Sequence, residues 1–162
     1  MSESDQGKPQ PSRPVMPGYG VPKTKKGLLS WEYVTGRLTA VRDYWVGTAG
    51  STGAPHAVPV WGVWVDDRLY FSGGSDVRWV RNLRGNPQVA VHIGSGDEPV
   101  IVEGTVMLTE EQGDEAERVM DAYEVKYGFR HPPPFWRLTP RRAFAWTDLG
   151  KDATRWVLPG SS

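Results

Sequence analysis

Apolar and polar residues alternate along most of this 162-residue chain, and alternation with a period of two is typical of half-buried strands. The turn-forming stretches Gly50–Gly53 and Asp66–Asp67 separate the first of these segments. The pattern predicts strands at residues 44–49, 57–65, 68–72, 88–93 and 98–109, a strand pair or one bent strand at 135–149, and a last strand or tail at 153–158.

Three other segments follow helical spacing. Ser30 is a candidate N-cap for a first helix, and a short helix is predicted from about Ser75 to Arg84. Thr109 and Gln112 have the spacing of a capping box, which predicts a long helix ending at Gly128, with Tyr123 and Tyr127 on its buried face. The apolar face of the first helix consists of Trp31, Val34, Leu38 and Val41.

The order of these elements indicates the fold class. Most strand connections are short, which favours antiparallel hairpins, and closing the sheet removes its exposed edges. The sequence therefore predicts a mainly β domain at residues 27–158, an antiparallel barrel of six to seven strands with flanking helices. Residues 1–26 are rich in Pro, Gly, Ser and Lys and lack periodicity, so we expect an N-terminal tail that is largely disordered.

Composition excludes several classes of function. The 19 basic and 19 acidic residues give a net charge of zero, so no overall charge favours nucleic acid or an anionic membrane as a partner. Without cysteine there is no disulfide, thiolate metal site or cysteine nucleophile. The N-terminus has no apolar signal core and no segment is long enough to span a membrane, so a cytoplasmic location is expected.

The stretch "FSGGSDVRWVRNL", residues 71–83, has the composition of an anion site. Gly73 and Gly74 allow close approach of a ligand to the backbone and can adopt positive φ, and a following helix N-terminus favours negative charge. Hydroxyl donors come from Ser72 and Ser75, while Arg78 and Arg81 lie three residues apart and project from one side. The alternative is a surface helix with solvated arginines and Ser75 as a simple N-cap.

A second indication comes from "HAVPVWGVWV", residues 56–65. Pro59 removes a backbone donor in mid-strand, so this strand is expected to be interrupted or to lie at an edge, with free backbone groups for a heterocycle. Trp61 and Trp64 either contact such a ring or pack in the core. No histidine spacing favours a metal site, although His56 is close enough to touch a ligand. Arg141 and Arg142 form either a rim charge pair or a site for an acidic tail.

Three stretches together carry a resemblance: "PHAVPVWGVWVDDRLYFSGGSDVRWVRNLRGNPQVAVHI", "EPVIVEGTV" and the terminal "ATRW". They resemble the pyridoxamine 5′-phosphate oxidase-like split β-barrel superfamily, and within it the flavin/deazaflavin oxidoreductases that often use coenzyme F420. The resemblance covers about residues 28–158 and does not separate FMN from F420.

The resemblance implies a homodimer with two cofactor sites at its interface. It implies an oxidoreductase that transfers a hydride from F420, or alternatively FMN, to an unsaturated small molecule; a further alternative is a protein that binds a planar ligand without turnover. No catalytic side chain is expected, because the cofactor carries the chemistry. Trp79 stands where relatives usually have lysine, which predicts a weaker phosphate contact. The implied cofactor-binding residues are Val58, Pro59, Val60 and Trp61 for the ring, Ser72, Gly73, Gly74, Ser75, Arg78, Trp79 and Arg81 for the phosphate, and Thr154, Arg155 and Trp156 of the partner chain over the ring.

Overall fold

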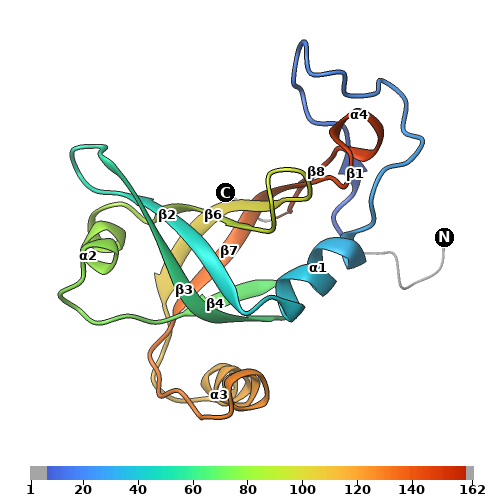
Figure 1. Cartoon of the computed structure of the whole chain (residues 1–162). Helices are drawn as coiled ribbons and strands as arrows, with labels where there is room; N and C mark the ends of the chain where they lie inside the picture. The colour runs from blue at the N-terminus through green and yellow to red at the C-terminus, as the bar shows by residue number, and fades with distance from the viewer. Residues whose placement is uncertain (1–6, 160–162) are drawn as a thin grey trace.

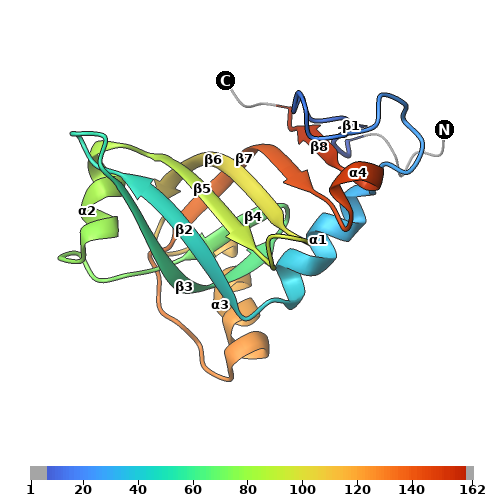
Figure 2. The ribbon, with the colours of Figure 1, turned by 45° about the horizontal axis from the view of Figure 1, so that its top comes forward.

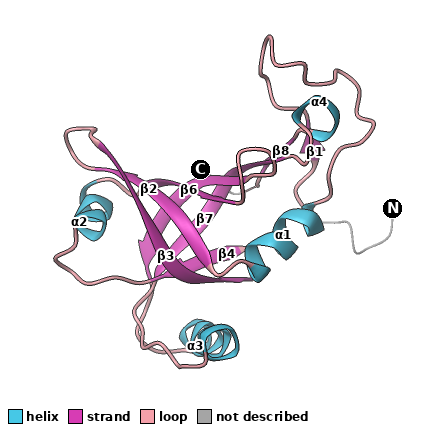
Figure 3. Ribbon diagram, in the orientation of Figure 1, coloured by secondary structure: helices cyan, strands magenta, loops and turns pink. Residues whose placement is uncertain are grey.

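The computed structural model describes residues 7–159 and consists of an antiparallel β-barrel with helices around it (Figures 1 and 3). The barrel is closed because β2 pairs with both β3 and β5, and β7 pairs with both β4 and β6. The predicted fold class is confirmed, with six barrel strands. They are β2 (Asp43–Ala49), β3 (Pro55–Val65), β4 (Arg68–Phe71), β5 (Gln88–Ile93), β6 (Val100–Leu108) and β7 (Trp136–Ala145).

One edge of β7 is shared between two neighbours. Its first three residues, Trp136–Leu138, pair with β4, and Arg142–Ala145 pair with β8 (Thr154–Val157). The single continuous strand β7 therefore replaces the strand pair that was one of the two predicted alternatives. Because β4 and β8 occupy successive parts of the same edge, the sheet splits between them.

Four helices surround the barrel: α1 (Trp31–Ala40), α2 (Arg78–Gly85), α3 (Asp114–Tyr127) and the short α4 (Leu149–Asp152). Figure 2 shows α1 and α2 near opposite ends of the barrel, with α3 beneath β3 and β4. The start of α2 differs from the prediction, because its N-cap is Val77, without a side-chain hydrogen bond, and not Ser75. Thr109 does not cap α3 either: its Oγ1 accepts from the backbone N–H of Phe135, and α3 follows Gly113.

The hydrophobic core lies inside the barrel, and α1 packs against it with Trp31, Val34 and Leu38. Trp31 of this helix makes edge contacts with the rings of Trp64 and Trp156, at centroid distances of 6.4 and 5.7 Å. A second, smaller core lies between α3 and the outside of the barrel, and it includes Val119 and Tyr123 of the helix. The strand alternation predicted from the sequence thus buries one face, and the other face stays at the surface.

The N-terminal segment differs from the predicted disordered tail, of which residues 1–6 lie outside the described part. Pro11–Ser12 form β1, which pairs with β8. The Arg13 guanidinium donates to the carbonyls of Thr24, Lys26 and Ala153 and so closes residues 13–26 into a loop. Composition suggested disorder because the segment has no core of its own, but one arginine with five donors supplies the missing contacts.

Trp79 belongs to the core. Its side chain is 7% exposed and its ring lies 5.6 Å from that of Phe71. A Cβ on Gly73 would come within 2.2 Å of Trp79 Cζ2, so glycine is required there by close approach of the indole. Neither Gly73 nor Gly74 has positive φ, and this part of the predicted reason for the two glycines is wrong.

Gly104 is the second position where only glycine fits. The register of β6 against β7 shifts between Glu103 and Gly104, and a Cβ on Gly104 would come within 2.2 Å of the Thr139 carbonyl oxygen. The close approach of two backbones at this irregularity is what allows β6 and β7 to complete the barrel.

Gly104→Ala is expected to lower the free energy of unfolding by about 2 kcal/mol or more, because the methyl group meets backbone that cannot move aside. The matched control is Gly36→Ala in α1, where a Cβ meets nothing within 4 Å. That change should raise the free energy of unfolding by about 0.5–1 kcal/mol. Urea denaturation monitored by tryptophan fluorescence measures both, and equal effects of the two substitutions would contradict this account of Gly104.

Trp79→Lys introduces the lysine that the family resemblance implies at this position but removes a buried ring. We expect a loss of about 3 kcal/mol or more in the free energy of unfolding, because the core loses an indole and gains an ammonium group. Trp79→Phe keeps an apolar ring and should cost less than half as much. A Trp79→Lys variant as stable as the wild type in urea would show that the indole contributes little to the core.

Candidate functional site

The predicted ring-binding strand and glycine loop meet in one cavity of about 520 Å³. β3 contributes Pro59, Val60 and Trp61, and the loop after β4 contributes residues 72–74. Val77 and the buried Trp79 complete this side, so the indole forms part of the cavity wall and does not stand free. The cavity is completed by residues that the sequence analysis did not assign: Tyr123, Phe129 and His131.

β3 presents an open backbone edge to this cavity. β4 pairs only with Gly62–Val65, and no strand in the described part of the chain pairs with residues 55–61 on that side. Pro59 lies in this half-paired stretch, opposite Trp45 of β2. The strand is not interrupted, which corrects one of the two predictions, but it does become an edge. Val58 packs against the barrel core, so only its backbone is available here.

The predicted anion site is divided between two hollows. Arg78 and Arg81 line a neighbouring hollow of about 330 Å³, which they share with the tip of the β2–β3 hairpin. Ser51 and Thr52 of that tip add hydroxyl groups. Val77 lines the cavity and Arg78 lines the hollow, so the two spaces lie on either side of the first turn of α2. Ser75 is exposed and lines neither of them.

The side-chain amide of Asn82 fixes the position of the hairpin relative to α2. Asn82 Nδ2 donates to Thr48 Oγ1 at 3.0 Å, and a Cβ on Gly50 would come within 2.9 Å of Asn82 Oδ1. The hairpin tip is therefore tied to α2 by the asparagine beside the two arginines. The sequence signal that could have indicated this is the turn "GSTG", whose small hydroxyl residues were interpreted only as a turn.

The aromatic wall comes from β3, from α3 and from the loop that follows α3. We use this name for Trp61, Tyr123, Tyr127, Phe129 and His131. Trp61 stacks on Tyr127 with a centroid distance of 4.7 Å and an interplanar angle of 4°. Phe129 lies 6.2 Å from Trp61, and His131 lies 5.1 Å from Tyr123. The tyrosines were interpreted only as the buried face of a helix, although "YGFRHPPPF" places rings on both sides of a rigid proline run.

The wall is fixed to β3 at Gly62. Lys126 Nζ donates to the Gly62 carbonyl and to Tyr44 Oη, each at 2.8 Å. Tyr127 Oη accepts from the Gly62 N–H at 2.9 Å. Burial lowers the pKa of the Lys126 ammonium to about 8, because the charged form loses contact with water. Two of these three bonds reach Gly62 in β3 and one reaches Tyr44 in β2, and together they set the position of the wall relative to the open edge of β3.

The three C-terminal residues assigned to a partner's ring are located in β8. Trp156 is fully buried in its own barrel, and Thr154 is also buried, accepting from the Leu29 N–H at 2.8 Å. Neither side chain is free to reach another chain, because the pairing of β8 with β7 draws both into the core. Arg155 is partly exposed in a separate groove beside Met16 and Phe144, and its contact with a ring stays a prediction.

The charges around the cavity are few. None of its lining residues is Asp, Glu, Lys or Arg, and His131 is the one imidazole among them. Among the described residues there is no group of three or more His, Cys, Asp or Glu placed to hold a metal ion. No helix in residues 7–159 is long and apolar enough to cross a membrane. The geometry suits a flat ligand with an anionic end near α2.

Comparison with solved structures supports the barrel assignment at low identity. The conserved hypothetical protein Rv2991 from Mycobacterium tuberculosis has a TM-score of 0.64 and 19% identity, over 78% of this chain and 89% of that chain. The heme storage protein HutZ from Vibrio cholerae has 0.58 and 15%, over 74% and 94%. A heme binding protein from Mycobacterium smegmatis has 0.59 and 18%, over 74% and 54%. Among curated proteins none matches.

The sequence itself matches one family across most of the barrel. The family described as pyridoxamine 5′-phosphate oxidase matches residues 36–150, which include β2–β7, the cavity and the hollow beside α2. With the closed barrel and the likeness to the solved structures, this match shows that the chain belongs to the pyridoxamine 5′-phosphate oxidase family.

Proposed function

We propose that the protein is an oxidoreductase that binds coenzyme F420, or alternatively FMN, in the cavity between β3 and α2. The observation that carries the proposal is the meeting of the open β3 edge with the loop at residues 72–74 in one cavity. Free backbone N–H and C=O groups recognise the edge of a heterocycle, and a space of this size suits flat ring systems.

The residues present fit such a cofactor in two parts. The ring would lie along residues 58–61, where β3 has no β4 neighbour. The phosphate would lie across the first turn of α2, within reach of Arg78 and Arg81. The open space at Gly74 supports this placement of the cofactor between ring and phosphate, since a Cβ on Gly74 would meet nothing within 4 Å. When bound, the cofactor supplies the hydride chemistry, and the chain supplies position, exclusion of water and the two guanidinium groups.

A second candidate is binding of heme, and it is favoured by His131. The imidazole lines the cavity and its Nδ1 lies 2.8 Å from the Pro132 carbonyl oxygen, so Nδ1 carries the proton and Nε2 has a free lone pair. A neutral imidazole with one nitrogen fixed by a hydrogen bond is the usual state of a metal-ligating histidine. Several proteins of similar fold are named for heme.

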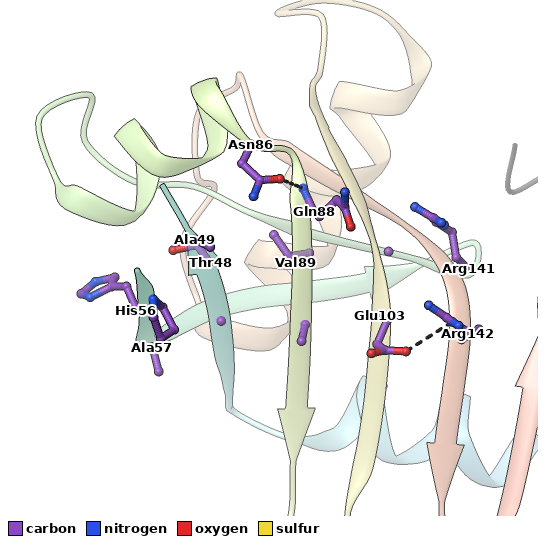
Figure 4. Close-up of a pocket in the computed structure, with 14 residues that line it drawn as sticks. Thr48, Ala49, His56, Ala57, Asn86, Gln88, Val89, Glu103, Arg141 and Arg142 are labelled. Atoms are coloured by element: carbon purple, nitrogen blue, oxygen red, sulfur yellow. Dashed lines mark hydrogen bonds and ion pairs between the residues drawn. The ribbon is translucent and has the colours of Figure 1, made fainter. Parts of the chain in front are cut away.

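We also propose that a second copy of the chain packs on the outer face of β3, β2, β5 and β6. One row across these strands consists of small residues, with Ala57 opposite Gly47 and Gly47 opposite Ala90. The row lies in a trough of about 720 Å³ that ends at the Glu103–Arg142 ion pair (Figure 4). The next outward row includes Trp45, which is 46% exposed and stacks on His92.

This face has the features of a self-complementary interface. A shallow trough of small side chains allows close approach of two sheets, and the neighbouring Trp45 supplies an aromatic anchor. In Figure 4, Arg141 and Arg142 lie at one edge of the trough and His56 at the other. Solvent would otherwise cover an apolar row on a face with few charges. The partners proposed for the chain are thus a second copy and a small-molecule substrate.

Titration of F420 and of FMN tests the cofactor proposal through quenching of tryptophan fluorescence. We expect saturable binding of at least one of them, weakened at least tenfold in Arg78→Ala and Arg81→Ala because a charge-assisted phosphate contact is lost. Arg84→Ala is the matched control, since Arg84 lies on the same helix but lines neither space. No saturation by either cofactor up to high micromolar concentration would contradict the proposal.

Hemin in place of the two cofactors tests the second candidate. If His131 ligates iron, hemin should give a sharpened Soret band that His131→Ala abolishes and Arg78→Ala leaves unchanged. A Soret band that is unaffected by the loss of His131 would rule out this ligand.

Ala90→Arg tests the interface. A guanidinium in the trough should convert a dimer into a monomer in sedimentation experiments, whereas Ala90→Ser should leave the dimer intact. A wild-type chain that sediments as a monomer at micromolar concentration would contradict the proposed face.

A further inference from the structure

Apart from Trp61, the aromatic wall is the part of the cavity that the cofactor proposal does not use. Two of its rings are half-exposed, Trp61 at 44% and Phe129 at 42%, although the wall is otherwise packed. Tyr127 already covers one face of Trp61. Large aromatic rings left open beside a cavity are a stacking surface for a flat ligand, since an offset ring pair stabilises by more than burial alone.

In His131 the wall carries a hydrogen-bonding group whose polarity the structure fixes. The Pro132 carbonyl can only accept, so the bond of 2.8 Å to His131 Nδ1 places the proton on Nδ1. In the neutral imidazole, Nε2 is therefore an acceptor. Contacts with the rings of Tyr123 at 5.1 Å and Phe135 at 5.7 Å hold the imidazole in place. A ligand on the wall is expected to offer an O–H or N–H group to Nε2.

Charge narrows the class of ligand further. The cavity lining holds no Asp, Glu, Lys or Arg, so an ionised ligand would find no counter-charge there. Beside the wall, the Arg42 guanidinium lies 4.8 Å from the centroid of the Trp61 ring and 5.5 Å from that of Tyr127. The ligand is thus flat and largely apolar, with one donor.

We propose that the aromatic wall is the substrate subsite of this cavity and that it takes flat aromatic alcohols or enols, whose hydroxyl donates to His131 Nε2. This assignment rests on the proposed function, because it makes the wall the partner of a ring bound along β3. His131 and Phe129 act in specificity: the phenylalanine provides stacking area for any flat ring, and the histidine selects those that carry a hydroxyl.

The experiment compares 2-naphthol with 2-methoxynaphthalene, which have the same ring system but differ in the donor. Binding to the full chain without added cofactor is measured by calorimetry. We expect 2-naphthol to bind about 3–10-fold more tightly, the factor for one neutral hydrogen bond. In His131→Phe this preference should disappear while both compounds still bind, and in Phe129→Ala both should weaken by a similar factor.

His92→Phe is the control variant, because His92 stacks on Trp45 on the outer face and does not line the cavity. It should leave both affinities and the preference unchanged. Equal binding of the two compounds by the wild type, a preference retained in His131→Phe, or no binding of either compound would each overturn the assignment. Binding of 2-naphthol by a chain that binds neither F420 nor FMN would leave the wall intact and remove the cofactor proposal alone.

Discussion

The docking of α3 on the backbone of Gly62 is the interaction on which the site depends. At this residue β3 passes from a strand with two neighbours to a strand with one, because β4 ends opposite it at Phe71. A Cβ on Gly62 would come within 2.7 Å of the Tyr70 carbonyl oxygen and 3.4 Å of the Tyr44 ring. Glycine therefore allows three elements to converge, and Lys126 and Tyr127 bind its carbonyl and N–H.

This convergence explains why a cavity forms at all. An open strand edge is normally protected by charge, proline or a covering element. Here Pro59 removes one donor, and α3 with its loop stands beside the edge without pairing to it. The half-buried ammonium of Lys126 is the cost of this arrangement, since its desolvation is only partly offset by Asp43. The bonds that fix the wall also keep the edge available to a ligand.

The sequence predicted the barrel and the edge within β3 because both depend on local signals. Strand alternation gives the six strands, and a proline in mid-strand marks an edge wherever the strand lies. The role of Trp79 could not be predicted from the sequence. The position in which an amphipathic helix docks decides whether one of its residues faces the core or a ligand. Its close contact with Gly73 joins two neighbours in sequence, but only the folded loop brings the indole over the glycine. The aromatic wall was not predicted because Tyr123 and His131 lie more than fifty residues beyond β3 in the sequence. Only the fold brings them to that strand.

The burial of Trp79 also changes how the anion site should be understood. The side chain at this position adds no charge to the proposed anion site, because the indole is buried in the barrel core. The remaining positive charge lies on Arg78 and Arg81, in a hollow whose other wall is the β2–β3 hairpin tip. The two guanidinium groups thus lie beside the hydroxyl residues Ser51 and Thr52 and outside the apolar cavity. Separation of a charged hollow from an uncharged cavity by one helical turn suits a ligand with an anionic end and a flat, neutral ring, because each end then meets an environment of its own polarity.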